Sequence, residues 1–360
     1  MNGRDADSAV LVALQRIDKL TPKRREYLLA MSPVPSGLLS AELRPKVCAV
    51  LGESATDFFN FVAESEKYAD GLEKKGIGFV TYLDDEYPEL LGEIDSRPAV
   101  LFTKGNVSLL DTFSIAIVGT RRPTRYGAKL ADEFAREFVR AGITVVSGFA
   151  RGIDSCAHRA CVDVGAPTVA VFGCGVDVCY PAENRELYRA VLDNGGLFVS
   201  EYAPGTHPMP FRFPERNRII SGLCHGVLLP EAAEKSGSLI TANTALEQGR
   251  DLFVVPGNVY SPESGGTNAL LRTMPHALTL SPEDVLAYYR MTTEEKRGEE
   301  PVQFDMTESL ILDSLHDGEK HFEEILADTG LTAAELSGAL VNLELAGALV
   351  QTGGNHYALC

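Results

Sequence analysis

The stretch Ser114-Ile115-Ala116-Ile117-Val118-Gly119-Thr120-Arg121-Arg122-Pro123 joins a short apolar run to a turn of glycine and arginine. A continuous run of this length, rich in β-branched residues, is typical of a strand that is buried on both faces of a sheet. A pattern with apolar residues at helical spacing follows, from about Tyr126 to Ala141. The stretch therefore predicts the first strand, loop and helix of an α/β sheet.

The same alternation of strand and helix continues through the middle of the chain. Apolar runs separated by helices of about ten residues are typical of a parallel, doubly wound sheet. We expect strands over residues 143–146, 168–172, 197–200, 226–229 and 252–255, and helices over residues 154–164, 183–192, 216–223 and 239–248.

Other patterns surround this middle region. Residues 1–75 are mostly helical in pattern and are interrupted by prolines, while residues 76–290 hold the predicted sheet. A charged linker follows over residues 291–303. Residues 304–360 contain three amphipathic helix patterns and a terminal hairpin, which together predict a winged helix.

The charge is unevenly distributed along the chain. The formal net charge is -17, yet residues 112–290 hold 17 basic and 18 acidic side chains, and 15 of the basic ones are arginine. Residues 301–360 hold one lysine and ten acids, which opposes DNA docking and favours a protein-contact surface. The seven cysteines show neither a pairing pattern nor the spacing of zinc ligands, so we expect a cytoplasmic protein with no metal site. The sequence has no long apolar run and no secretion signal, so we expect no membrane insertion.

Four glycine-rich turns stand where parallel strands should end, and three of them carry arginine or lysine. In an open α/β sheet such loops gather at one crevice, and bare backbone amides beside cations suit a phosphate. We therefore expect a phosphate-binding site without catalytic residues or a bound cofactor. The candidate binding residues are Gly119, Thr120, Arg121, Arg122, Gly148, Phe149, Arg151, Gly173, Gly175, Arg216, Arg218, Lys235, Ser236, Gly237 and Ser238.

Several of these residues allow a second interpretation. Arg216 and Arg218 lie among aromatic residues, as in a groove for single strands, but they could equally hold loops by bonding carbonyl groups. Asp154 and His158 are four residues apart and could form an acid–base pair, although a helix cap with a packed histidine is the more common arrangement. A dinucleotide site is disfavoured because the first loop lacks the usual glycine spacing.

Five motifs resemble those of the DNA processing protein A family. They are residues 119–123, 147–154, 180–184, 213–223 and 236–242. The resemblance implies an extended Rossmann-like fold with a sterile-alpha-motif-like N-terminal domain and a C-terminal winged helix. It also implies a dimeric protein of natural transformation that binds and protects single-stranded DNA and loads a RecA-type recombinase onto it. In that family Arg121 and Lys235 would hold the DNA backbone.

One departure from the family pattern concerns the dimer, and one alternative function stays open. The stretch Met274-Pro275-His276-Ala277 interrupts a segment in which the family usually has a Gly-Ala pair, near the expected dimer contact. The alternative function is a Rossmann-fold hydrolase acting on nucleoside monophosphates. Such enzymes carry a catalytic glutamate after a Pro-Gly-Gly turn, whereas the comparable turn here reads Glu234-Lys235-Ser236-Gly237-Ser238.

Overall fold

The computed structural model describes residues 3–17, 20–291, 304–345 and 347–359. The chain divides into two compact units, residues 1–293 and 294–360. Apart from Met291, the charged linker predicted over residues 291–303 lies outside the described residues. The division of the first unit into a helical domain over 1–75 and a sheet domain over 76–290 stays a prediction.

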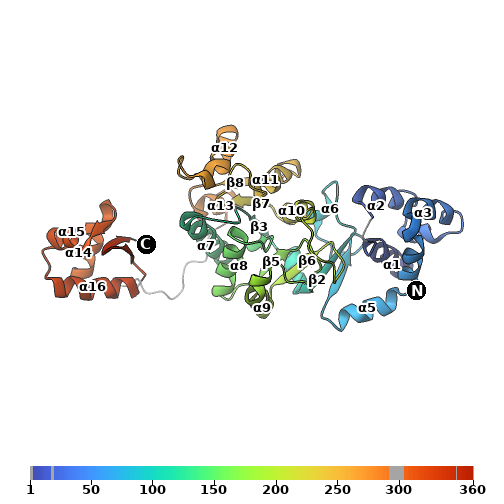
Figure 1. Cartoon of the computed structure of the whole chain (residues 1–360), viewed down its shortest axis with the longest axis horizontal. Coiled ribbons are helices and arrows are strands. Elements are labelled where there is room, and N and C mark those ends of the chain that lie inside the picture. The colour runs from blue at the N-terminus through green and yellow to red at the C-terminus, as the bar shows by residue number, and fades with distance from the viewer. Residues whose placement is uncertain (1–2, 18–19, 292–303, 346, 360) are drawn as a thin grey trace. The chain divides into compact units, whose positions relative to one another are not determined.

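An eight-stranded sheet runs through the first unit in the order β1-β2-β6-β5-β4-β3-β7-β8 (Figure 1). The six strands from β6 to β8 in this order are parallel, while β1 and β2 are antiparallel additions at one edge. The predicted doubly wound sheet is thus confirmed. Its strands are β1 (Gly78–Thr81), β2 (Val100–Gly105), β3 (Ser114–Ile117), β4 (Thr144–Ser147), β5 (Thr168–Val171), β6 (Leu197–Ser200), β7 (Gly226–Leu229) and β8 (Asp251–Val254).

Helices cover both faces of this sheet because the side chains of each strand alternate between two cores. Ile115 and Ile117 of β3 pack in one core with Phe134, whereas Ala116 and Val118 pack in the other with Ile220. The helices are α6 (Glu89–Gly92), α7 (Arg125–Arg140), α8 (Ile153–Asp163), α9 (Arg185–Asp193), α10 (Arg212–Gly222), α11 (Ser238–Glu247), α12 (Gly265–Thr273) and α13 (Pro282–Tyr288).

One helix is longer than its sequence pattern predicts. We expected a helix from Arg216 to Leu223, but α10 begins at Arg212. Pro214 lies in its first turn, where a missing backbone N–H costs no hydrogen bond. The residues that resembled a groove for single strands therefore lie on a helix, and their side chains point to different sides of it.

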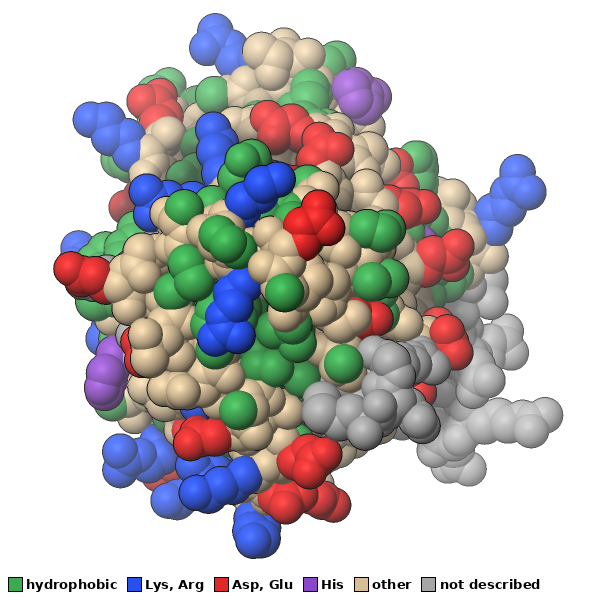
Figure 2. Space-filling model, turned by 90° about the vertical axis from the view of Figure 1, so that its right-hand side faces the viewer, with side chains coloured by type: hydrophobic (Ala, Val, Ile, Leu, Met, Phe, Trp, Pro, Cys, Tyr) green, Lys and Arg blue, Asp and Glu red, His purple; other side chains and the backbone are tan. Residues whose placement is uncertain are grey.

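The N-terminal helices form a bundle that shares its first helix with the sheet. Leu11 and Val12 of α1 pack against the core around β2, while Val10 and Leu14 pack in the bundle with Phe58. A helix that is apolar on all sides must be buried on all sides. The bundle consists of α1 (Gly3–Gln15), α2 (Pro22–Leu29), α3 (Arg44–Leu51) and α4 (Ala55–Ala63), and α5 (Ser65–Glu73) follows it with Leu72 in the core around β2. Figure 2 shows the face on this side of the molecule, where basic, acidic and apolar side chains are intermixed.

The second unit has the predicted winged-helix order. Three helices precede a hairpin, and a short strand pairs with the hairpin's second strand. Lys320 forms an ion pair with Asp328 at 2.6 Å, while Glu335 and Glu344 are exposed on the third helix. The elements are α14 (Met306–Ser314), β9 (Lys320–His321), α15 (Phe322–Thr329), α16 (Ala333–Leu345), β10 (Leu349–Gly353) and β11 (His356–Leu359). In the described part of the chain, no helix is both long and apolar enough to cross a membrane.

Candidate nucleic-acid interface

A cavity of about 540 Å³ opens at the carboxyl ends of β3 and β7. The strand order reverses between these two strands, and ligands of open α/β sheets bind at such a point. The loop of residues 118–122 forms one wall and the loop of residues 235–238 forms another. Phe213 of α10 also lines it, and we call this cavity the first pocket.

The loop after β3 is packed too closely for any residue but glycine at its start. A Cβ atom on Gly119 would lie 2.7 Å from the carbonyl oxygen of Glu231 and 2.6 Å from a side-chain carbon of Ile153. The next amide, that of Thr120, donates to the same Glu231 carbonyl at 2.9 Å. This contact joins the loop after β3 to the loop after β7 across the pocket.

The carboxylate of Glu231 fixes the far end of the same loop. Its side chain is buried and accepts hydrogen bonds from the amide of Thr124 at 2.8 Å and from its hydroxyl at 2.7 Å. The Thr124 hydroxyl in turn caps α7 by accepting from the amide of Gly127 at 3.2 Å. Arg121 and Arg122 therefore sit on a loop that is held at both ends.

Three cations around the first pocket have side chains that are free to bind an anion. Arg121, Arg122 and Lys235 are exposed, and none of them forms a side-chain hydrogen bond or an ion pair with a described residue. The guanidinium carbon of Arg121 lies 5.9 Å from the centre of the Phe213 ring. Tyr180 packs against the same ring at 5.3 Å between centroids, so an aromatic pair borders the cationic wall.

The second wall is the start of α11. The hydroxyls of Ser236 and Ser238 lie 2.7 Å apart, and the amide of Ser238 donates to Ser236 Oγ at 3.3 Å. The helix begins at Ser238, so its amino end faces the pocket. The partial positive charge at that end adds to the charge of Lys235 in attracting an anion.

Arg216 forms the floor of the pocket and is held by the protein itself. It is 3% exposed and donates from Nη1 to the carbonyl oxygens of Gly148, at 2.7 Å, and Val171. Burial lowers the pKa of Arg216 to about 10, and the nearby charge of Asp154 opposes that shift. Arg216 thus ties the ends of β4 and β5 together beneath the pocket.

Asp154 and His158 are occupied by structural contacts. Asp154 accepts a hydrogen bond from the amide of Ala150 at 3.2 Å, and burial raises its pKa against the effect of Arg216. Nδ1 of His158 lies 2.9 Å from the hydroxyl of Thr168, which itself donates to a backbone carbonyl. No hydrogen bond joins the two residues, so the geometry favours a packed histidine over an acid–base pair. The N-cap of α8 is Gly152, so Asp154 does not cap the helix and instead binds the loop before it.

The buried His158 predicts an acid-sensitive fold. Burial, and then the charge of Arg216, lower its pKa from 6.5 to about 3. Between these values the unfolded chain binds a proton that the folded chain does not, so stability falls as the pH falls below about 6.5. We expect this residue to account for about 3 kcal/mol of lost stability by pH 4.5. Urea unfolding at a series of pH values from 7 to 4.5 measures the loss. The free energy of unfolding should depend less on pH in His158→Gln than in the unchanged protein. An equal dependence on pH in both proteins would contradict the role given to His158.

Six of the predicted binding residues do not line the first pocket. Phe149 is fully buried against Phe172, Gly173 lies beneath the Phe213 ring, and Arg151 pairs with Glu183 on the surface. The nine that do line it are Gly119, Thr120, Arg121, Arg122, Arg216, Lys235, Ser236, Gly237 and Ser238, and the six that do not are Gly148, Phe149, Arg151, Gly173, Gly175 and Arg218.

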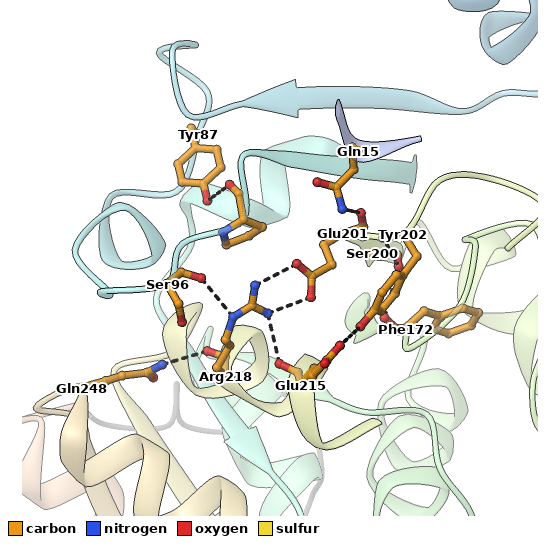
Figure 3. Close-up of polar contacts among 11 residues, drawn as sticks. Gln15, Tyr87, Ser96, Phe172, Ser200, Glu201, Tyr202, Glu215, Arg218 and Gln248 are labelled. Atoms are coloured by element: carbon orange, nitrogen blue, oxygen red, sulfur yellow. Dashed lines mark hydrogen bonds and ion pairs between the residues drawn. The ribbon is translucent and has the colours of Figure 1, made fainter. Parts of the chain in front are cut away.

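Arg218 is the centre of a separate polar network (Figure 3). Its two terminal nitrogens each donate to Glu201 at 2.8 Å, and its Nε donates to the carbonyl of Ser96 at 3.0 Å. Gln248 of α11 donates to the Arg218 carbonyl at 3.0 Å. Arg218 therefore connects α10 to β6, α11 and the loop before β2, which supports the loop-holding interpretation for this residue.

The sequence pattern did not reveal the role of Glu231. Its position in the sequence could have indicated this role: Glu231 lies two residues beyond a buried strand, and residues there face the crevice of an open sheet. Phe213 was also missed as a pocket residue. Its place beside Arg212 in the sequence was visible, but its contact with Tyr180 depends on the fold.

A sequence profile of the DNA recombination-mediator protein A family matches residues 78–290, which is more than half of the chain. The chain belongs to this family. A second profile, of the DprA winged helix domain, matches residues 297–355. The resemblance drawn from the loop motifs is thereby confirmed.

Individual relatives support the same assignment. The chain is 44% identical to DNA processing protein DprA of Streptococcus pneumoniae over 58% of this chain and 72% of that protein. It is 35% identical to Protein Smf of Escherichia coli over 77% of this chain and 76% of that protein.

Two solved structures of the family are similar to the fold. The X-ray structure of DNA processing protein A from S. pneumoniae superposes with a TM-score of 0.65 at 35% identity, covering 77% of this chain and 95% of that one. A structure of the Helicobacter pylori protein, whose title describes its single-stranded DNA binding mode, gives a TM-score of 0.54 at 31% identity, covering 59% and 95%.

Proposed function

We propose that this protein binds single-stranded DNA in the first pocket, protects it and passes it to a RecA-type recombinase during natural transformation in the cytoplasm. The observation that carries the proposal is a set of three cations, Arg121, Arg122 and Lys235. Their side chains form no hydrogen bond or ion pair with the residues that the structure describes, and the exposed Tyr180 lies nearby against Phe213. Family membership and the single-stranded DNA described for the H. pylori relative support it.

The mode of binding follows from the chemistry of the two walls. Backbone phosphates would bind the guanidinium of Arg121, Lys235 and the amino end of α11, because charge-assisted hydrogen bonds to phosphate are stronger than neutral ones. Unstacked bases would lie on Phe213 and Tyr180, since every base has a π-face and stacking needs no sequence code. The role is binding without catalysis or cofactor, and Arg216 supports the floor.

A homodimer is part of the proposal. Ile240 and Leu246 are exposed on α11, and Tyr260, in the segment between β8 and α12, is 91% exposed. Exposed apolar surface is a feature of protein contacts. Because α11 begins at the first pocket, pairing through this side would place two pockets along one DNA strand. In the acidic second unit, residues 304–359 hold one lysine, Lys320, which pairs with Asp328. This unit would serve as a contact for another protein rather than for DNA.

The test is fluorescence anisotropy of the purified protein with a labelled dT oligomer and with a duplex of the same length, across a salt series. We expect preference for the single strand, with a slope of log affinity against log salt of roughly -2 for three phosphate contacts. Equal affinity for both, or none at low salt, would contradict the proposal. In that case, release of free base from nucleoside monophosphates would favour the hydrolase.

A further inference from the structure

A second cavity, of about 340 Å³, lies in the same unit between the N-terminal helices and the end of β6. Gln15 of α1 and Arg25 of α2 line one side of it. Tyr202, which follows β6, and Phe211 and Arg212 at the start of α10 line the other. Figure 3 shows Gln15 and Tyr202 around this corner of the molecule. We call it the second pocket.

Arg25 brings to this pocket a positive charge that no protein group binds directly. Its guanidinium forms no hydrogen bond or ion pair with any described residue, and its Nε is buried without a partner. The two nearby carboxylates are occupied: Glu201 by both terminal nitrogens of Arg218, and Glu215 by the Tyr202 hydroxyl at 2.9 Å. A half-buried guanidinium in this state is suited to a phosphate, which offers it charge and hydrogen-bond acceptors.

Aromatic rings lie next to this charge. Phe211 is 56% exposed, which is unusual for a phenylalanine at the rim of a cavity. The guanidinium of Arg212 lies 5.6 Å from the centre of the Phe211 ring and 5.0 Å from that of Tyr202. An exposed ring beside stacked arginine matches the surface on which nucleic-acid bases stack.

The two pockets are both lined by residues of α10, and the second also by its N-cap, Phe211. Phe213 and Asn217 of this helix line the first pocket, whereas Phe211, Arg212 and Glu215 line the second. Residues 211 and 213 are two positions apart, so the two rings stand on different sides of the helix start. A strand that leaves Phe213 would reach Phe211 by crossing the first turn of α10.

We propose that the second pocket is a further nucleotide subsite, in which Arg25 binds a backbone phosphate and Phe211 stacks a base of the same single strand. The inference rests on the proposed function, because it extends the path of the DNA beyond the first pocket. It assigns the N-terminal helices a direct part in binding. The exposed Phe211 ring on the side of the pocket opposite Arg25 favours a nucleotide, with its base and phosphate, over a bare anion.

The experiment measures the affinity of the full chain for a ladder of dT oligomers from about 4 to about 16 nucleotides, the range of single-strand sites. We expect affinity to rise in a step when the strand becomes long enough to reach both pockets. Arg25→Gln and Phe211→Ala should each remove most of that step, weakening the longest oligomer about five- to tenfold and leaving the shortest unchanged. Melting curves establish that both variants are folded.

The matched control is Arg24→Gln, which removes the same charge from an exposed neighbour on α2. It should lower the affinity much less than Arg25→Gln does. Crosslinking of an oligomer with 5-iodouracil at successive positions, followed by peptide mapping, should place a base at Phe211 or Tyr202. Equal effects of the two arginine variants, or a crosslink pattern confined to the first pocket, would overturn the subsite.

The outcomes separate this inference from the proposed function. If Arg121→Ala abolishes binding of short oligomers while Arg25→Gln and Phe211→Ala leave the ladder unchanged, the first pocket binds DNA and the second does not. If free dTMP or inorganic phosphate binds in an Arg25-dependent way without any change in the ladder, the second pocket is a small-molecule site and the inference fails. Absence of single-strand binding at every length would overturn both proposals together.

Discussion

Replacing Arg121 by alanine is expected to weaken binding of a dT oligomer by roughly 1–3 kcal/mol, or about 5- to 150-fold at fixed salt. The loop that carries Arg121 is held by Thr120 and Thr124 through Glu231, so its backbone is in place before any ligand arrives. A preorganised loop loses little backbone entropy on binding, so removal of the guanidinium costs most of the contact. The fold should be unaffected because the side chain is exposed.

The measurement is an anisotropy titration at two or more salt concentrations, with a melting curve of each protein. Arg140→Ala is the matched control, because Arg140 ends the helix whose other end lies beside the pocket, about 22 Å away for its 16 residues. It removes the same charge from the molecule without touching the site. Similar losses in the two variants would mean that the general field of the protein attracts DNA. An unchanged affinity for Arg121→Ala would remove this residue from the interface.

Replacing Gly152 by alanine is expected to destabilise the fold by about 3–5 kcal/mol, combining backbone strain with overpacking. The backbone of Gly152 has φ of 77° and ψ of -129°, a conformation that residues other than glycine rarely adopt. The new Cβ would lie 2.3 Å from the carbonyl oxygen of Thr120 and 2.7 Å from the carbonyl carbon of Arg121. Either the loop before α8 or the pocket loop must therefore move.

Chemical denaturation gives the free energy of unfolding, and Gly165→Ala is the control. Gly165 also has a positive φ, of 71°, but nothing lies within 4 Å of a Cβ placed there. Its replacement should cost about 1–2 kcal/mol, the strain of a left-handed backbone alone. The difference between the variants isolates the steric contact with the pocket loop. If both lose the same stability, that loop yields easily and is not the rigid support for Arg121 described above.

The architecture of the sheet was predictable because its local signals agree with one another. The buried strand of residues 114–118, the glycine turn after it and the amphipathic helix that follows each favour the same unit, and the unit repeats. The loops at the strand ends could be located by counting strands, since parallel strands end at one edge. Eight of the fifteen candidate residues line the pocket for this reason, and a ninth, Arg216, reaches it from α10.

The remaining features depend on contacts between distant segments. The neighbours of an arginine in space decide whether it faces a ligand or a carbonyl group. Those of Arg216 and Arg218 come from segments up to 122 residues away in the sequence. The second pocket combines α1 and α2 with the start of α10, which no local pattern links. The antiparallel direction of β1 and β2 could likewise not be predicted, because strand direction depends on pairing and not on composition.

Because α1 is buried in two cores, it limits both where the chain can be truncated and which substitutions the helix can accept. Because Leu11 and Val12 complete one core while Val10 and Leu14 complete another, the helix transmits a disturbance in either core to the other. A chain cut after residue 75 would leave the sheet with an unfilled apolar surface, and the bundle alone would expose the opposite side of α1. The N-terminal helices and the sheet should therefore melt in a single cooperative transition, and α1 has no side on which substitutions could accumulate freely.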